Sequence, residues 1–285
     1  MVEQRKMQKN NYNKNRYPKN KSNESYEHGR RTYDAASEDN LDECLVYGRN
    51  SVRELLKSER TVDKLYIAKG VREGSISYIA ELAIEKKIPI VEVEKQKLDN
   101  MCRGANHQSV AAMAAAKDYS SIEDIIEIAH QRGQKPLVVI LDGIEDPHNL
   151  GAIIRTAECC GVHGVIIPKH RCATLNSVVA KTSAGALEYM AIAKETNIAM
   201  TIEKLKKAGF WVFGAEAGGE SYYDADFDVP CAIVLGSEGK GISRLVKEKC
   251  DYIVSIPLYG QINSLNVSAA AAVIISEAAR QHNKQ

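Results

Sequence analysis

The stretch IEDPHNLGAIIRTAECCG (residues 144–161) follows the apolar run PLVVILDG and places Asp146, Asn149 and Arg155 in a polar loop and the helix behind it. The order strand, polar loop, helix is typical of an open parallel sheet, which presents ligands at the carboxyl ends of its strands. Asn149 and Arg155 lie six residues apart, so a helix turns them away from one another, and we expect them around the mouth of a pocket. The purely structural alternative is that Asn149 caps the helix and Arg155 is solvated.

Residues 136–285 have the pattern of a larger α/β domain. The runs PLVVILD, GVIIP and CAIVLG are apolar throughout, as strands are when helices cover both faces of a sheet. KAGFWVFGAE and DYIVSIPL are similar but less completely apolar. We expect helices between them at residues 149–160, 174–181 and 198–208, and a last, Ala-rich helix in SLNVSAAAAVIISEAARQH. These elements predict a parallel sheet with helices on both sides.

Residues 44–117 alternate shorter strands and helices, which predicts a small α/β module. Asn50 or Ser51 is expected to cap its first helix. The module is too short to hold a substrate cleft of its own, so we interpret it as a domain that recognises the substrate. Residues 118–135 are predicted to form a linker helix, capped by one of the two serines in SSIEDII.

Residues 1–43 form a different kind of segment. From Met1 to Tyr33 there are nine Lys or Arg residues against three Glu, and almost no apolar residue to bury. We therefore predict a disordered basic tail. Two interpretations remain open: a solubilising segment, or a cationic arm that binds the phosphates of RNA or DNA.

The composition, 44% hydrophobic and 26% charged residues with a net charge of +1, is ordinary for a globular protein. No apolar run reaches the length of a signal peptide or a membrane span, so we expect a cytoplasmic protein with no membrane contact. The seven cysteines form no C-x-x-C pair and the seven histidines have no zinc-type spacing. We therefore predict that the cysteines are reduced thiols in the core and that there is no metal site.

Two further polar stretches follow apolar strands. LGSEGKGIS (residues 235–243) places several glycines beside Glu238, but it lacks the Lys-Ser/Thr of a phosphate loop and the third glycine of a dinucleotide fingerprint. IPLYGQINSLNVSAAA (residues 256–271) places Ser264 and Asn266 just before the last helix. These two side chains could cap that helix or line a pocket.

In this order, the patterns D-P-x-N-x-G-x-x-x-R-T-A, L-G-x-E-x-x-G and I-P-L…S-L-N-V-S-x-A-A resemble the three motifs of the SpoU/TrmH family of RNA ribose 2′-O-methyltransferases, in the SPOUT superfamily. The resemblance extends over residues 136–285. The preceding module, with GRNSVRELL and GANHQSVAA, resembles the ribosomal-protein-like substrate-binding domain of the branch that methylates a guanosine in 23S rRNA. The basic tail has no counterpart in the resemblance.

The resemblance implies a fold, a reaction and partners. The expected reaction is the transfer of a methyl group from S-adenosylmethionine to the ribose 2′-hydroxyl of a guanosine in 23S rRNA, by a homodimer that needs no metal. The expected fold is a parallel sheet with a C-terminal trefoil knot, which would tuck the segment after Ile256 under the loop of residues 235–243. Knotted folds are rare exceptions among proteins.

The resemblance also implies site residues, all of which this sequence retains. The catalytic set corresponds to Asn149, Arg155, Glu238, Ser264 and Asn266. The cofactor would be held by backbone or apolar groups of Gly214, Ala215, Leu235, Gly236, Ile256 and Leu265. Apolar walls suit an adenine ring, and backbone groups can bind its edge.

Arg155 is the residue to which the family assigns activation of the hydroxyl. Either it accepts the proton, or it stays cationic, stabilises the forming alkoxide and binds an adjacent phosphate. A free guanidinium has a pKa above about 12 and is a poor base, so we favour the cationic role.

Other functions remain open at the level of the sequence. The enzyme could modify a tRNA, or an rRNA adenosine as in antibiotic resistance. The chain could also be a non-catalytic RNA-binding or ribosome-assembly factor. The module of residues 44–117 favours rRNA, because tRNA-modifying members of the family usually lack it. The complete set of catalytic residues favours an enzyme.

Overall fold

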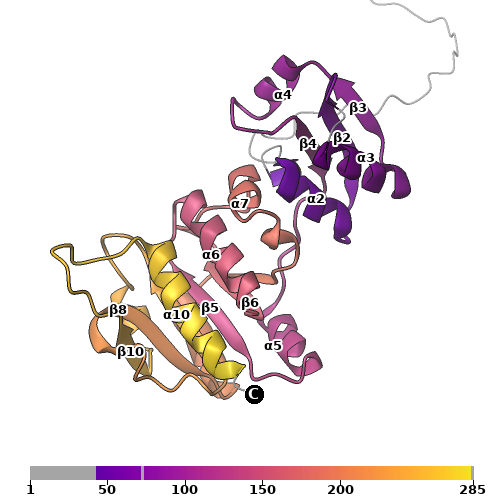
Figure 1. The fold of residues 1–285 in the computed structure, drawn as a ribbon. Coiled ribbons are helices and arrows are strands. Elements are labelled where there is room, and N and C mark those ends of the chain that lie inside the picture. Colours follow the sequence, from indigo (N-terminus) through magenta and orange to yellow (C-terminus); the bar gives the residue numbers. More distant parts are fainter. Residues whose placement is uncertain (1–42, 72–73, 284–285) are drawn as a thin grey trace, which may run out of the picture. The chain divides into compact units, whose positions relative to one another are not determined.

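The computed structural model describes residues 43–71 and 74–283. The predicted basic tail lies outside these residues. The first part of the described chain is an α/β module whose four-stranded sheet has the order β1-β4-β2-β3 (Figure 1). Its elements are β1 (Leu45–Tyr47), α2 (Arg49–Lys57), β2 (Val62–Ala68), α3 (Ser75–Glu85), β3 (Ile90–Val93), α4 (Lys95–Met101) and β4 (Val110–Ala114).

The first helix of this module, α2, forms where the sequence predicts it, but its cap differs. Val52, Leu55 and Leu56 are fully buried on one face. The N-cap residue is Gly48, with φ of 90°, and no side chain caps the helix. The prediction that Asn50 or Ser51 caps α2 is therefore wrong. Glycine adopts a positive φ without steric cost. The helix therefore begins directly after Gly48, and Asn50 and Ser51 lie inside it instead of at its cap.

The second domain contains a six-stranded sheet in which every pairing is parallel, with the order β10-β8-β9-β5-β6-β7. Its strands are β5 (Leu137–Asp142), β6 (Gly164–Pro168), β7 (Ile192–Glu195), β8 (Trp211–Ser221), β9 (Cys231–Gly236) and β10 (Tyr252–Ser255). Its helices are α5 (Ile122–Gln131), α6 (Pro147–Cys159), α7 (Ser177–Thr182), the short 3₁₀ helix η1 (Ala186–Glu188), α8 (Ile198–Lys207), α9 (Arg244–Lys247) and α10 (Val267–His282). The predicted parallel α/β architecture is confirmed; the trefoil knot stays a prediction.

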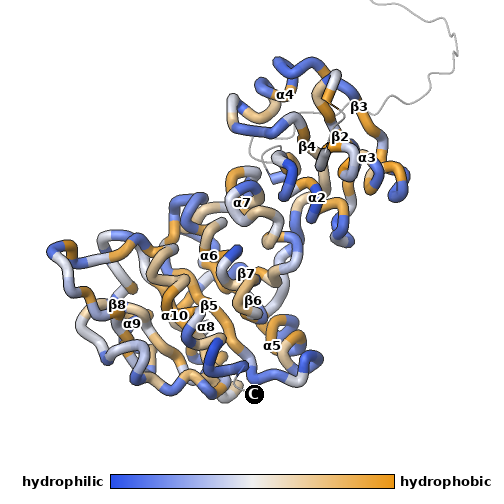
Figure 2. Tube along the Cα trace, viewed as in Figure 1, coloured by the Kyte–Doolittle hydropathy of each residue, from blue (hydrophilic) through white to orange (hydrophobic). Residues whose placement is uncertain are grey.

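Strand β5 shows why apolar runs mark the centre of this sheet. Its first five residues are at most 2% exposed, because both faces are covered. Leu137, Val139 and Leu141 pack in the cluster that contains α6 and α10. Val138 and Ile140 pack in the cluster that contains α5 and α8. Figure 2 shows β5 as a hydrophobic stretch within this domain, with hydrophilic loops at its margins.

The ends of the helices are set by short polar side chains. The Ser121 hydroxyl accepts a hydrogen bond from the Asp124 amide, and the Asp124 carboxylate accepts one from the Ser121 amide, so a capping box starts α5. Helix α7 begins at Ser177, three residues later than predicted, because Asn176 caps it. Strand β7 was not predicted. It is only four residues long and only half of it is buried, which leaves a weak pattern.

The described residues can be examined for a membrane span, for a metal site and for the state of the cysteines. In residues 43–71 and 74–283, no helix is both long and apolar enough to cross a membrane. The same ranges contain no group of three or more His, Cys, Asp or Glu residues placed to hold a metal ion. The cysteines are unpaired, and burial raises the pKa of the Cys231 thiol to about 12. Cys159 differs from the predicted core thiols, because it is exposed at the end of α6.

Candidate active site

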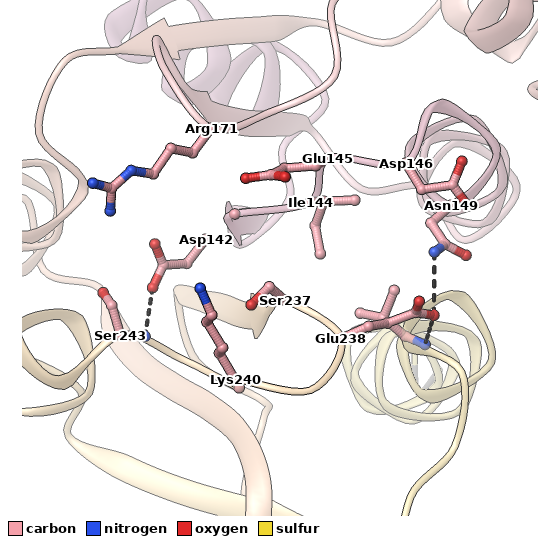
Figure 3. A pocket seen from close by; sticks show the side chains of 13 residues that line it. Asp142, Ile144, Glu145, Asp146, Asn149, Arg171, Ser237, Glu238, Lys240 and Ser243 are labelled. Carbon is pink, nitrogen blue, oxygen red and sulfur yellow. Dashed lines mark hydrogen bonds between the residues drawn. The ribbon is translucent and has the colours of Figure 1, made fainter.

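A cavity of about 450 Å³ opens at the carboxyl ends of the two central strands, β5 and β9 (Figure 3). Asp142 and Gly236, the last residues of these strands, are partners in the parallel register. The segments that follow them supply most of the lining, including Glu145, Asn149 and Glu238. The cavity therefore lies at the edge of the sheet where the sequence predicts a ligand.

The first turn of α6 brings Asn149 into this cavity. Asp146 is the N-cap, and its carboxylate accepts a hydrogen bond of 2.9 Å from the His148 amide. Pro147 follows as the first residue of the helix, a position where its missing N–H has no cost. The alternative that Asn149 caps the helix is therefore wrong. Its side-chain amide is left to face the cavity, with Asn149 7% exposed.

Three residues from three distant stretches form one hydrogen-bonded cluster. Asn149 Nδ2 donates to Glu238 Oε1 at 3.2 Å. Asn266 Nδ2 donates to Glu238 Oε1 at 2.6 Å and to Asn149 Oδ1 at 3.0 Å. The carboxylate of Glu238 thus receives two amide donors and fixes the orientation of both asparagines. We refer to Asn149, Glu238 and Asn266 as the amide–carboxylate cluster.

Asn266 has two roles at once. Its Oδ1 accepts hydrogen bonds from the amides of Ser268 and Ala269, at 2.9 and 3.4 Å, and so caps α10. Its Nδ2 reaches the other members of the cluster. The interpretation of Asn266 as a cap is therefore correct, whereas its role in a pocket stays a prediction, because Asn266 is not among the residues that line the cavity. Ser264, the other proposed cap, is exposed and does not cap α10.

The loop after β9 is a tight turn that depends on glycine. The amides of Ser237 and Gly241 each donate to the carbonyl of the other, at 3.1 and 2.9 Å. A Cβ on Gly236 would overlap the backbone of Gly241 and Ile242. The Ser243 amide donates to Asp142 Oδ2 at 2.7 Å, which ties the loop to β5 (Figure 3). The glycines of this motif thus allow backbone to approach backbone closely.

Two of the five predicted catalytic residues lie apart from the cluster. Arg155 is exposed on α6 and does not line the cavity. Within the described residues it has no hydrogen bond or ion pair to another side chain. Ser264 is exposed in the segment between β10 and α10 and is likewise without such a partner there. The catalytic roles of Arg155 and Ser264 remain predictions.

The predicted cofactor residues gather along three neighbouring strands. Ala215 on β8 pairs in register with Leu235 on β9. Ile256 directly follows β10, which is the other neighbour of β8. Gly214 is buried against side chains of Ile253, Cys250 and Ile242, so its lack of a side chain is explained by packing. Leu265, in the last motif, is 43% exposed.

An acidic residue that sequence reasoning missed lies beside these positions. Glu216 follows Ala215 on β8, and its Oε1 accepts a hydrogen bond of 2.7 Å from Lys247 Nζ. Its Oε2 is buried and has no hydrogen-bond partner within the described part of the chain. S-adenosylmethionine has hydroxyl and amino donors that could satisfy such an oxygen, so this acceptor fits the cofactor. The available signal was an acid at the carboxyl end of the run KAGFWVFGAE.

Three charged residues of the cavity were also missed, namely Glu145, Arg171 and Lys240. Each had a weak signal. Glu145 directly precedes the first motif, Lys240 lies inside the second, and Arg171 follows shortly after the apolar strand β6. A single charge in an exposed loop looks the same in a sequence whether it faces a cavity or solvent.

Comparisons with known proteins assign the family. Residues 136–276 match the model of the SpoU rRNA Methylase family, and residues 45–120 match that of the RNA 2′-O ribose methyltransferase substrate-binding domain. YacO of Bacillus subtilis, named as a TrmH family tRNA/rRNA methyltransferase, is 44% identical over 239 residues, which are 84% of this chain and 96% of YacO. A Staphylococcus haemolyticus protein of the same family name is 44% identical over 245 residues, 86% of this chain and 98% of that protein. The chain belongs to the SpoU/TrmH family.

Solved structures share the fold. The SpoU methyltransferase AviRb of Streptomyces viridochromogenes, in complex with the cofactor AdoMet, matches with a TM-score of 0.70 and 22% identity, over 83% of this chain and 89% of AviRb. A TrmH family protein of Porphyromonas gingivalis matches with a TM-score of 0.64 and 24% identity, over 86% of this chain and 98% of that one. At these identities the likeness supports the fold alone.

Proposed function

We propose that this protein methylates the ribose 2′-hydroxyl of a guanosine in 23S rRNA. Family membership makes it an S-adenosylmethionine-dependent RNA 2′-O-ribose methyltransferase. The choice of 23S rRNA is supported by the substrate-binding domain that precedes the catalytic domain and by its resemblance to the branch acting on that RNA. The observation that carries the proposal is the amide–carboxylate cluster at the edge of a nucleoside-sized cavity.

Residues at the ends of β8, β9 and β10 would hold the cofactor. Backbone groups of Gly236, Ile256 and Leu265 would bind the adenine edge, with Ala215 on the wall. The unpaired oxygen of Glu216 would accept a donor from the cofactor. The bound cofactor supplies an electrophilic methyl group on a sulfonium. The protein must align the attacking oxygen with that methyl carbon and the sulfur, which is a task of positioning.

The cluster is suited to hold the ribose in that alignment. Asn149 and Asn266 are fixed by mutual hydrogen bonds and by Glu238, so their remaining polar groups point in defined directions. Preorganised amide groups of this kind orient a substrate without a further entropic cost. We assign Asn149 the orientation of the ribose, Glu238 the support of both asparagines, and Ser264 with Asn266 the shaping of the pocket.

Arg155 is assigned to the departing proton of the 2′-hydroxyl. Its exposed position on α6 leaves the guanidinium available to an RNA phosphate. In this account the cation would stabilise the alkoxide as the O–H bond breaks and the proton passes to solvent. The oxygen would form its bond to the methyl carbon as the bond between that carbon and the sulfonium sulfur breaks, which releases S-adenosylhomocysteine.

The RNA target can be identified directly. Total RNA from a strain lacking the gene is incubated with the protein and radiolabelled S-adenosylmethionine, the labelled RNA species are separated, and the modified position is mapped by primer extension. We expect label in 23S rRNA at one guanosine. Label in tRNA or at an rRNA adenosine would contradict the proposed target. Absence of label in any RNA would favour a non-catalytic RNA-binding role.

A further inference from the structure

Several polar side chains around the cavity are already engaged within the protein. Asp142 accepts the amide of Ser243, and Asp146 accepts the amide of His148. Glu238 accepts both asparagine amides of the cluster. These three carboxylates therefore have structural partners, and a ligand would have to compete with bonds that hold the site together.

Three other charged side chains of the cavity are not engaged in this way. Glu145, Arg171 and Lys240 line the cavity, and within the described residues none of them has a hydrogen bond or ion pair to another side chain. Figure 3 shows Arg171 and Lys240 toward one end of the cavity, Asn149 and Glu238 at the other, and Glu145 between them. Glu145 and Arg171 come from the loops after β5 and β6, and Lys240 faces them from the loop after β9. One carboxylate and two cations are thus left for a ligand.

Arg171 is held in place by its backbone as well. Its φ of 58° lies in the left-handed region, which is unusual for a residue other than glycine. Two residues further on, the amide of Ala173 donates to the carbonyl of Ile144 at 2.9 Å, next to Gly143, whose own φ is 87°. The two loops after β5 and β6 therefore approach each other closely, and this contact fixes the point from which the Arg171 side chain extends.

We propose that Glu145 recognises the guanine base of the target nucleotide, with Arg171 and Lys240 on the opposite edge of the ring. This inference rests on the proposed methyl transfer to an RNA ribose. With the ribose at the amide–carboxylate cluster, the base extends toward the uncommitted charges. Glu145 accepts the N1–H and N2–H of guanine, and the two cations donate to O6 and N7. A cation on O6 and N7 is the commonest specific contact to guanine.

Guanine is the base that fits this arrangement of charges. It presents two neighbouring donors, N1–H and the N2 amino group, which match the two oxygens of one carboxylate. Adenine and cytosine place an acceptor nitrogen beside their amino group, and this nitrogen would repel the second oxygen of Glu145. Uracil has a single ring donor between two carbonyls. An unpaired base, turned out of its helix, exposes the edges that these contacts require.

The identity of the methylated nucleoside is the first test. In vitro transcribed 23S rRNA is incubated with S-adenosylmethionine and the protein, digested to nucleosides, and assayed by mass spectrometry. We expect 2′-O-methylguanosine. Formation of another 2′-O-methylnucleoside would overturn the inference while leaving the proposed methyl transfer intact. If 23S rRNA and total RNA both yield no 2′-O-methylnucleoside, the proposed function itself fails.

The second test uses Glu145→Gln, with Glu123→Gln as the matched control. Glu123 is an exposed glutamate on α5 that does not line the cavity. We expect Glu145→Gln to lower kcat/KM by about 10- to 100-fold, the range for loss of a two-point base contact. The control should be unchanged. Thermal melting of both variants shows whether they remain folded, and wild-type activity in a folded Glu145→Gln protein would overturn the assignment.

An RNA with inosine at the target position distinguishes a contact between Glu145 and the base from a structural role of Glu145. Inosine lacks the N2 amino group, so a ligated RNA with inosine at the mapped position should be a poorer substrate for the wild type, by roughly 10-fold. For the Glu145→Gln variant, the same replacement of guanosine by inosine should lower the activity little further. An equal loss in both proteins would show that Glu145 does not contact N2. The same comparison, with 7-deazaguanosine in place of inosine, tests the variants Arg171→Gln and Lys240→Gln. If both variants lose as much activity as the wild type on this replacement, the two cations do not contact the base.

Discussion

At the scale of single residues, Asn266 shows how one side chain can serve both the fold and the site. Its oxygen caps α10 and its nitrogen holds Glu238 and Asn149. The two functions use different atoms, so substitutions can separate them. Serine keeps a capping oxygen but has no amide to reach the cluster, whereas alanine removes both.

We expect Asn266→Ala to lower the free energy of unfolding by about 1 kcal/mol through loss of the cap, and Asn266→Ser to lower it less. Both variants should lose methylation activity, because neither can orient the other two members of the cluster. Denaturant unfolding and a methylation assay measure the two effects. Retention of activity in Asn266→Ser would show that the link to Glu238 is dispensable.

Arg155 is separated from the cluster in the structure, which makes a sharp prediction possible. Arg155→Ala should abolish methylation but leave cofactor binding measurable by calorimetry, because the exposed guanidinium is assigned to the hydroxyl and phosphate of the RNA. Loss of cofactor binding in this variant would be inconsistent with that role.

The pH dependence of the rate distinguishes the two accounts of Arg155. A cation that only stabilises the alkoxide remains charged throughout the accessible range, so wild type and Arg155→Lys should have profiles of the same shape. A wild-type rate that rises well above neutral pH, together with a flat profile in Arg155→Lys, would instead indicate that Arg155 accepts the proton.

At the scale of elements, the junction between α5 and the sheet depends on a neutral histidine. The amide of Leu137, at the start of β5, donates to His163 Nδ1 at 3.0 Å, and His163 Nε2 lies 3.0 Å from Gln134 Oε1. His163 is 4% exposed. Burial, with a smaller effect of the nearby Arg132 charge, lowers its pKa to about 4.

This pKa predicts a loss of stability in mild acid. Between the unfolded value near 6.5 and the folded value of about 4, the unfolded chain binds a proton that the folded chain does not, so the free energy of unfolding falls as the pH falls. The full effect is at most roughly 3 kcal/mol. His163→Gln cannot be protonated, so its stability should change less between pH 6.5 and 4. Parallel curves for the two proteins in denaturant titrations would contradict this.

The elements also show what a sequence pattern can and cannot predict. Strands β5, β6 and β9 were predictable because burial on both faces leaves continuous apolar runs, and α10 because one face is apolar. Asn149, Glu238 and Asn266 were predictable as a set because three motifs occur in order. Their hydrogen bonds were not, since these depend on how loops far apart in the chain come together.

At the scale of the whole molecule, the segment between β10 and α10 exposes several large apolar side chains. Leu258, Tyr259, Ile262 and Leu265 are between 40% and 91% exposed. We propose a homodimer formed through the methyltransferase domain, in which such residues and part of α10 would be covered. Light scattering should give the mass of a dimer, and Ile262→Asp should shift it toward the monomer. A monomeric wild type would refute the proposed assembly.

The basic tail belongs to the same scale, although it lies outside the described residues. If its Lys and Arg residues bind RNA phosphates, deletion of the residues before Leu41 should weaken RNA binding and reduce the salt dependence of the affinity, because fewer counterions are released. Filter binding at several salt concentrations measures the slope. An unchanged slope would leave the tail without a part in RNA binding.

The double use of Asn266 has a practical consequence for following the enzyme in solution. The amides of Ser268 and Ala269 are protected from solvent by the same side chain that holds the cluster, so their hydrogen–deuterium exchange reports on whether the cluster is assembled. A substrate or inhibitor that stabilises the cluster should slow exchange at these two amides, and one that displaces Asn266 should accelerate it. Two backbone positions at the start of α10 therefore provide a label-free reporter of occupancy that needs no catalytic turnover.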